Sequence, residues 1–218
     1  MIIKELKLLS SDIKITKAFY QGKMGCAVLK EKDDHISFKT GNSILTFNFT
    51  DTYTAPFYHI AFSIPNNKFT EAAEWILQRR SVLPYSTHEL VADFKGWNAK
   101  AFYFHDDQQN ILEFITHFDL GTNDENAFSS NSVERICEIG IVADNVPATC
   151  GDIISQCNIP YFTKGPLMED FAVMGDSNGM LIISKTGRGW VPTQRPAEKF
   201  PVKIIAEVNG VDKELSFD

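Results

Sequence analysis

The stretch that decides the fold of this chain begins Phe57-Tyr58-His59-Ile60-Ala61-Phe62-Ser63-Ile64. Its alternation predicts a strand that presents His59 on one face and Ile60 and Phe62 on the other. Residues 67–79 repeat apolar side chains at helical spacing, which predicts an amphipathic helix. Residues 106–110 are a polar turn that leads into the strand Ile111-Leu112-Glu113-Phe114-Ile115. Residues 57–117 therefore form a strand–helix–strands unit with a His near its start and a Glu near its end.

The same order of elements occurs before and after this unit. Residues 1–50 predict a strand, a helix and three strands, and residues 133–218 repeat that order loosely before a hairpin across Asn209-Gly210. Residues 118–132 are polar and rich in turn formers. We therefore predict an α+β protein of paired βαβββ modules, 1–50 and 57–117, in one domain 1–120. A third βαβββ-like module and the hairpin form a second block, 133–218.

Composition excludes several classes of partner. The chain has 218 residues, is 44% apolar and carries a net charge of −7, so it can bury a core but lacks the basic clusters that nucleic acid or anionic membranes require. No apolar run approaches the roughly 20 residues of a membrane helix. The charged, alternating N-terminus does not resemble a signal peptide.

The cysteines indicate a reducing compartment. The four are Cys26, Cys137, Cys150 and Cys157, and none forms a Cys-x-x-Cys pair. Their irregular spacing is typical of buried small hydrophobic residues rather than of a zinc ribbon or a disulfide framework. We therefore expect a cytoplasmic protein.

Four features of residues 3–117 resemble one known family. They are the strand His59-Ile60-Ala61-Phe62, the aromatic strand Phe102-Tyr103-Phe104, the turn 106–110 and the strand Leu112-Glu113-Phe114. In this order the chain resembles the glyoxalase, bleomycin-resistance and extradiol-dioxygenase superfamily, also called the vicinal oxygen chelate fold. That resemblance implies a half-barrel of two modules around a shared hollow.

The resemblance also implies a set of metal ligands. In metal-dependent members, the first strand of each module and the last strand of the second module supply them, which here indicates Glu5, His59 and Glu113. Glu5 departs from the family, which usually has His at that position. In the third module, Glu138 occupies the first-strand position but Ile182 or Ile183 falls where a Glu would be. We therefore favour a structural role for Glu138.

The implied donor set determines which ions fit. One imidazole and two carboxylates suit a divalent ion such as Mn, Fe, Ni or Zn, and three protein ligands leave positions open for substrate oxygens. A His that satisfies its hydrogen bonds in the core is the alternative for His59. An ion pair with Lys7 is the alternative for Glu5.

Further residues are candidates for contacts with a substrate. Tyr103 faces the expected hollow, where its hydroxyl either hydrogen-bonds substrate or only packs, and Trp97 and Asn98 precede its strand at the expected rim. The glycines of the string Gly187-Arg188-Gly189-Trp190 either let Arg188 reach an anion while Trp190 covers a ligand, or form a tight turn in which Trp190 anchors the tail to the core. Of the two, we favour the anchor.

Three functions remain open on the sequence. The first is a metal-dependent lyase, isomerase, transferase or dioxygenase acting on a small oxygen-rich molecule, with Glu113 and Tyr103 as catalytic residues. The second is a metal-free protein that sequesters a small molecule, as bleomycin-resistance proteins do. The third is a structural module that forms a homodimer through residues 133–218. One fold hosts many activities, so a metal assay is what separates the first function from the others.

Overall fold

The computed structural model describes all 218 residues, and the first module begins at its N-terminus. Asp12 caps the first helix by accepting hydrogen bonds from the amides of Lys14 and Ile15. The helix then continues into a π-helical turn, so the sequence predicted one helix where the structure has two joined pieces. The elements are β1 (Ile2–Ser10), α1 (Ile13–Lys17), η1 (Ala18–Lys23), β2 (Val28–Lys32), β3 (His35–Thr40) and β4 (Ser43–Phe49).

The second module has the order expected from the sequence, with one further short strand. The strand predicted over residues 86–94 is confined to its last three residues, and a two-residue strand precedes it. The elements are β5 (His59–Ser63), η2 (Asn66–Lys68), α2 (Phe69–Leu77), β6 (Val82–Leu83), β7 (Ala92–Phe94), η3 (Lys95–Trp97), β8 (Ala99–His105) and β9 (Ile111–His117).

The third module lacks the second strand of the other two. Its elements are β10 (Arg135–Ala143), α3 (Val146–Cys157), β11 (Phe171–Asp176) and β12 (Gly179–Lys185). A loop follows the edge of β11 where that strand would run, and it pairs only at the isolated bridges Tyr161–Met174 and Leu167–Ala172. This module is therefore a shortened copy.

The connecting and C-terminal segments contribute two hairpins. Asn209 and Gly210 both have positive φ, at 52° and 78°, which is the backbone of the tight hairpin turn that this dipeptide favours. The elements are η4 (Phe118–Leu120), η5 (Ser130–Ser132), β13 (Gly189–Trp190), β14 (Arg195–Pro196), β15 (Val202–Val208) and β16 (Val211–Phe217).

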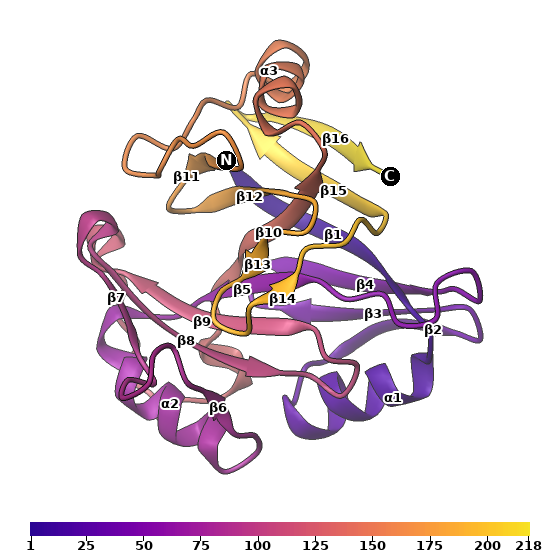
Figure 1. Cartoon of the computed structure of the whole chain (residues 1–218). Helices are drawn as coiled ribbons and strands as arrows, with labels where there is room; N and C mark the ends of the chain where they lie inside the picture. The colour runs from indigo at the N-terminus through magenta and orange to yellow at the C-terminus, as the bar shows by residue number, and fades with distance from the viewer.

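Strand pairing joins the modules differently from the sequence prediction. One sheet has the order β16-β15-β1-β4-β3-β2, and the eight-stranded sheet runs β11-β12-β10-β5-β9-β8-β6, with β7 beside β8 (Figure 1). The second module therefore shares its sheet with the third, and the expected sheet of modules 1–50 and 57–117 is wrong. The reason is that β1 already pairs with β4 on one edge and with β15 on the other. The domain boundaries at 1–120 and 133–218 stay a prediction.

The main core joins both sheets. It contains Ile3, Leu6 and Leu8 of β1 together with Ile60 and Phe62 of β5. A second, smaller apolar cluster covers the opposite face of the eight-stranded sheet and includes Trp190 and Ala197 from the β13–β14 hairpin. We call this opposite face the inner face. Every residue of β5 is therefore buried, on one face by the core and on the other by the hairpin segment.

The helices are short. Figure 1 shows α1 and α2 at the bottom of the view and α3 at the top. The longest, α3, has 12 residues, and no helix combines the length and apolarity needed to cross a bilayer.

Candidate functional site

Three adjacent strands aim acid and imidazole side chains at one point on the inner face. Ala61 of β5 pairs with Glu113 of β9 on one side and with Glu138 of β10 on the other. His59 lies two residues before Ala61, so it points to the same face. The register of β10, β5 and β9 therefore brings His59, Glu113 and Glu138 together.

A β-bulge in β10 directs Glu138 to this face. The pairing of β10 with β5 shifts between Ile136 and Glu138. Ile136 and Ile139 both belong to the main core, whereas Cys137 belongs to the inner-face cluster. Cys137 and Glu138 are consecutive, yet both point to the inner face. The extra residue of a β-bulge permits this break in alternation.

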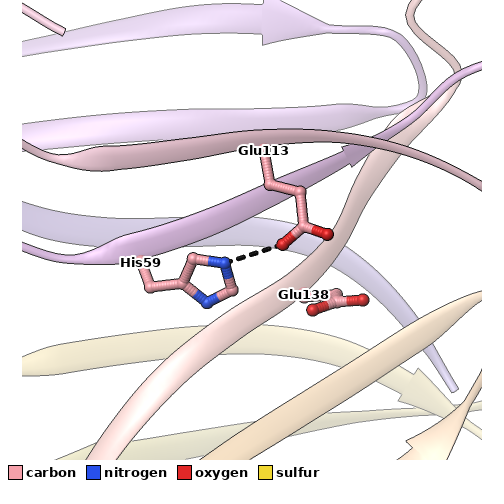
Figure 2. A group of neighbouring side chains, drawn as sticks. All are labelled: His59, Glu113 and Glu138. Atoms are coloured by element: carbon pink, nitrogen blue, oxygen red, sulfur yellow. Dashed lines mark hydrogen bonds and ion pairs between the residues drawn. The ribbon is translucent and has the colours of Figure 1, made fainter. Parts of the chain in front are cut away.

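The three side chains form a compact and buried cluster (Figure 2). His59 Nε2 and Glu113 Oε2 are hydrogen-bonded at 2.9 Å. One donor atom from each of the three residues lies within 4.8 Å of the other two. Relative exposures are 6% for His59, 2% for Glu113 and 3% for Glu138, so water solvates none of them well.

Burial disfavours charge on all three groups. It raises the pKa of Glu113 to about 8, which the nearby Tyr103 hydroxyl partly opposes. Burial, reinforced by the negative charge of Glu113, raises the pKa of Glu138 to about 8. Burial also lowers the pKa of His59, although Glu138 opposes that shift. In the absence of a cation, the cluster therefore favours a neutral imidazole and protonated carboxyl groups.

The cluster has the properties of a divalent-cation site. His59 Nδ1 and Glu138 Oε1 are buried without hydrogen-bond partners, and neither Glu113 nor Glu138 forms an ion pair with Lys or Arg. Two buried carboxylates without a cationic partner are costly, and a divalent ion would balance both charges. The residues present fit a metal.

The cluster lies at the floor of a cavity of about 190 Å³. Its walls are formed by Phe94, Trp97, Phe171, Ile182, Trp190 and Val191. The Trp190 ring lies 5.5 Å from the His59 ring, and a Cβ placed on Gly140 would lie 2.6 Å from the Trp190 ring. The absence of a side chain at Gly140 therefore allows Trp190 to cover the cluster.

The other predicted site residues lie in different places. Trp97 and Arg188 line the cavity, whereas Tyr103, predicted to contact substrate, does not; it lies directly across the strands from Glu113. Asn98 does not line the cavity either. Its φ is 51° and its side chain donates to Asp119 Oδ1 at 2.7 Å, so the position serves a turn outside the cavity.

Glu5 is not part of the cluster. It lies on β1 in the other sheet, where Glu5 Oε1 accepts a hydrogen bond from Thr46 Oγ1 at 2.9 Å. Its second oxygen lies 3.4 Å from Lys7 Nζ. The sequence prediction assumed that the first two modules share a sheet, and the pairing of β1 with β15 removes that possibility. The alternative reading, an ion pair with Lys7, describes Glu5 in this structure.

One residue of the site was assigned another role from the sequence. Glu138 was favoured as a structural carboxylate, yet it takes the place expected for Glu5. The signal for it is the pair Ile136 and Ile139, whose spacing of three does not fit an unbroken strand with both residues in the core. Trp190 was favoured as an anchor, and it is buried in the inner-face cluster, where its ring also lies beside that of His59.

Comparisons with solved structures identify the fold. A Bacillus subtilis protein assigned as a dioxygenase superposes with a TM-score of 0.59 at 13% identity, over 84% of this chain and 63% of that one. A mutant of glyoxalase I from Zea mays superposes with a TM-score of 0.55 at 12% identity, over 84% of this chain and 66% of that one. This chain has the vicinal oxygen chelate fold.

The likeness to the vicinal oxygen chelate fold is one of structure alone. No family model and no curated protein matches the sequence. The chain spans about two thirds of the length of these two structures. The chemistry must therefore be argued from the chain's own residues.

Proposed function

We propose that this protein is a divalent-metal-dependent enzyme acting on a small oxygen-rich molecule. The supporting observation is the buried cluster of His59, Glu113 and Glu138 at the floor of a cavity. The proposed ligands are one ring nitrogen of His59 and one oxygen from each carboxylate. This donor set suits Mn, Fe, Ni or Zn. The fold adds support, since it is the one in which metal-dependent members place ligands on these strands.

The residues around the cluster have separate proposed roles. A bound ion would act as a Lewis acid toward two adjacent substrate oxygens. Tyr103 would donate a hydrogen bond to Glu113 and so hold that carboxylate in place, and Glu113 would fix the position of the ion beside His59. The Trp190 ring, which lies beside His59, would exclude water from the cluster. Exclusion of water strengthens the electrostatic interactions within the cluster. The reaction would be a lyase, isomerase, transferase or dioxygenase reaction.

Metal content provides the test. Protein purified without chelator is expected to contain close to one equivalent of Mn, Fe, Ni or Zn by plasma mass spectrometry. Glu138→Gln is expected to lose most of it, because an amide carbonyl is a weaker ligand than a carboxylate. The matched control is Glu5→Gln, which changes the corresponding first-strand acid in the other sheet and should leave metal content unchanged.

The proposal fails in two distinguishable ways. Metal-free wild type whose melting temperature is raised by none of the four ions would contradict metal dependence. Equal loss of metal in Glu138→Gln and Glu5→Gln would contradict the assignment of the ligands. Circular dichroism of both variants would establish that each is folded.

The second candidate is a metal-free binding protein that uses the same cavity. The observation that favours it is Ile182, an apolar residue at the last-strand position of the third module, beside the cluster. The hydrogen bond between His59 and Glu113 also gives the metal-free cluster one internal partner. Under this function, a small molecule would raise the melting temperature in the presence of chelator.

We also propose a cytoplasmic location. All four cysteines are free thiols and three are buried, which supports a reducing compartment. Cell fractionation with a tagged chain would test this, and recovery outside the cytoplasm would contradict it.

A further inference from the structure

One permanent cation lines the cavity. Arg188 is the single Lys or Arg among its lining residues, and the other ionisable side chains there are His59, Glu113 and Glu138. The Arg188 side chain is 29% exposed, whereas those of His59 and Glu113 are 7% and 2% exposed. A molecule in the cavity therefore meets an accessible guanidinium as well as the buried acid–imidazole cluster, which favours ligands that carry a negative charge.

The guanidinium of Arg188 retains free hydrogen-bonding capacity. Its ion pair with Asp170 joins Nε to Oδ2 at 3.3 Å, which leaves the two terminal amino groups for another partner. Its Cζ lies over the Phe171 ring, 4.4 Å from the centroid. A guanidinium held in place by an aromatic ring can form a two-point hydrogen bond with a carboxylate.

The backbone around Arg188 is held in place. The amide of Arg188 donates to Lys185 O at 3.0 Å, and its carbonyl accepts from the Ala197 amide at 2.8 Å. Gly187 has a φ of 82°, a conformation that favours glycine. The Arg188 side chain therefore projects from a loop that is held by backbone hydrogen bonds and that continues into β13, which carries Trp190.

The walls select for shape. Phe94, Trp97, Phe171 and Trp190 present aromatic rings to a volume of about 190 Å³. Such a volume accommodates roughly one substituted ring, since a water molecule occupies about 30 Å³ of the liquid. Flat molecules make the most contact with aromatic walls.

We propose that the ligand of this site is a small planar organic acid. Its carboxylate pairs with Arg188, its ring lies between the aromatic walls, and its adjacent oxygens face His59, Glu113 and Glu138. This inference rests on the proposed function for the cluster end of the cavity. Its new content is the anion subsite at Arg188 and the substrate class that follows from it.

Asp170 competes with the ligand for Arg188. Its carboxylate is half-exposed and pairs only at Nε, so an incoming carboxylate can take the terminal amino groups or displace it. Removal of this charge in Asp170→Asn is expected to tighten acid binding several-fold and to leave a neutral analogue unaffected.

Three probes of one size test the subsite by calorimetry on zinc-loaded and metal-free protein. They are 3,4-dihydroxybenzoate, its uncharged amide 3,4-dihydroxybenzamide, and 3,4-dihydroxycyclohexanecarboxylate, which keeps the acid but is not flat. Wild type is expected to bind the benzoate at least about tenfold more tightly than the amide, because a charge-assisted pair is gained. It is expected to bind the cyclohexane acid about tenfold more weakly than the benzoate.

Variants assign the preference to one arginine. Arg188→Gln is expected to bind acid and amide within twofold of each other, and Arg188→Lys to recover only part of the preference, because lysine lacks the planar fork. The matched control is Arg195→Gln. Arg195 belongs to the same hairpin and lies over Phe57 at 3.3 Å, but it does not line the cavity, so its variant should keep the preference.

Several results would overturn the inference. They are equal affinity of wild type for acid and amide, a preference that survives Arg188→Gln, equal affinity for the flat and non-flat acids, and no binding of any probe at millimolar concentration. Failure of the proposed function is separate. It would show as absence of metal, whereas the acid preference of metal-free protein reports on Arg188 alone.

Discussion

The two sheets present the same strand positions with different chemistry. In the eight-stranded sheet, Glu113 pairs with the residue two positions after His59. In the six-stranded sheet, Thr46 pairs with Lys7, two positions after Glu5. Glu5 and Thr46 are therefore the counterparts of His59 and Glu113, and each pair is joined by a 2.9 Å hydrogen bond.

The difference between the sheets lies in where the positive charge comes from. Glu5 is partly exposed and has Lys7 Nζ at 3.4 Å, so its charge is compensated within the chain. Glu113 and Glu138 are buried, and His59 is the only basic side chain in their cluster. The comparison teaches that the same scaffold yields a self-sufficient polar cluster when a lysine is present. It yields a buried acid–imidazole cluster without a Lys or Arg partner when the lysine is absent and a second acid is added.

The largest effect that separates the sheets is a dependence of stability on pH in metal-free protein. The pKa of Glu113 and that of Glu138 are each raised to about 8 when folded, so the folded state retains protons that the unfolded state has lost above about pH 4.5. Burial lowers the pKa of His59 and of His117 instead, so their opposite contribution changes mainly near the unfolded His value of about 6.5. The free energy of unfolding is therefore expected to fall between about pH 7 and 8 by on the order of 2 kcal/mol.

Urea denaturation in chelator at several pH values would measure this slope. The double variant Glu113→Gln/Glu138→Gln is expected to flatten it, and Glu5→Gln to leave it intact. A flat wild-type profile would contradict the burial of two uncompensated acids.

The next effect concerns the contact between Trp190 and β10 in the eight-stranded sheet. In Gly140→Ala, the new Cβ would lie 2.6 Å from the Trp190 ring and 3.2 Å from His59 Cβ. Overpacking of this kind costs about 1–3 kcal/mol, and urea denaturation would measure it. Gly151→Ala is the matched control, because nothing lies within 4 Å of its Cβ position and alanine favours a helix. A neutral Gly140→Ala would mean that Trp190 does not rest on β10.

A smaller effect concerns the residue that lies across the strands from Glu113 in one sheet and from Thr46 in the other. Tyr103 lies across from Glu113 as Ser37 lies across from Thr46. Removal of the phenol hydroxyl in Tyr103→Phe is expected to weaken metal binding by about tenfold, the lower end of what outer-shell partners contribute. Competition with a chelating dye would measure this, with Ser37→Ala as control. Equal effects of the two variants would argue against a role for Tyr103 at the cluster.

The smallest effect is expected in the six-stranded sheet. Glu5→Gln removes an exposed ion pair but keeps an acceptor for Thr46, so the free energy of unfolding should change by less than about 1 kcal/mol. Thermal denaturation would check this. A loss of several kcal/mol would mean that Glu5 has a structural role beyond its pair with Lys7.

Much of the fold follows from the sequence because its signals are local. Alternation at residues 57–64, the helical stripe of 67–79 and Asn209-Gly210 each predict one element, and repetition of their order predicts the modules. The α+β class and the superfamily fold are confirmed. The pairing of modules is not a local property. The sequence predicts β1 and β5 as strands but does not indicate which strand pairs with the open edge of each. Only the structure shows that β15 takes one edge and β10 the other.

The candidate site was predictable in part for the same reason. His59 and Glu113 belong to one module, so their meeting needs only the parallel pairing of β5 with β9. The third donor comes from whichever module shares the sheet, so an incorrect partner module led to Glu5. The bulge added a second obstacle, since strict alternation does not reveal which way Glu138 points.

The bulge in β10 also has a consequence for how such a site is gained or lost over evolutionary time. Deletion of Cys137 would leave Ile136 opposite Phe62 and the acid opposite Ala61 in an unbroken ladder, so the acid would still face the imidazole. Loss of the bulge without a deletion would instead turn the acid toward the main core, because strict alternation places residues 137 and 138 on opposite faces. Homologous chains with identical donor residues could then differ in which of these residues face one another. Classification of such chains by donor identity alone would assign the same chemistry to proteins that do not share it.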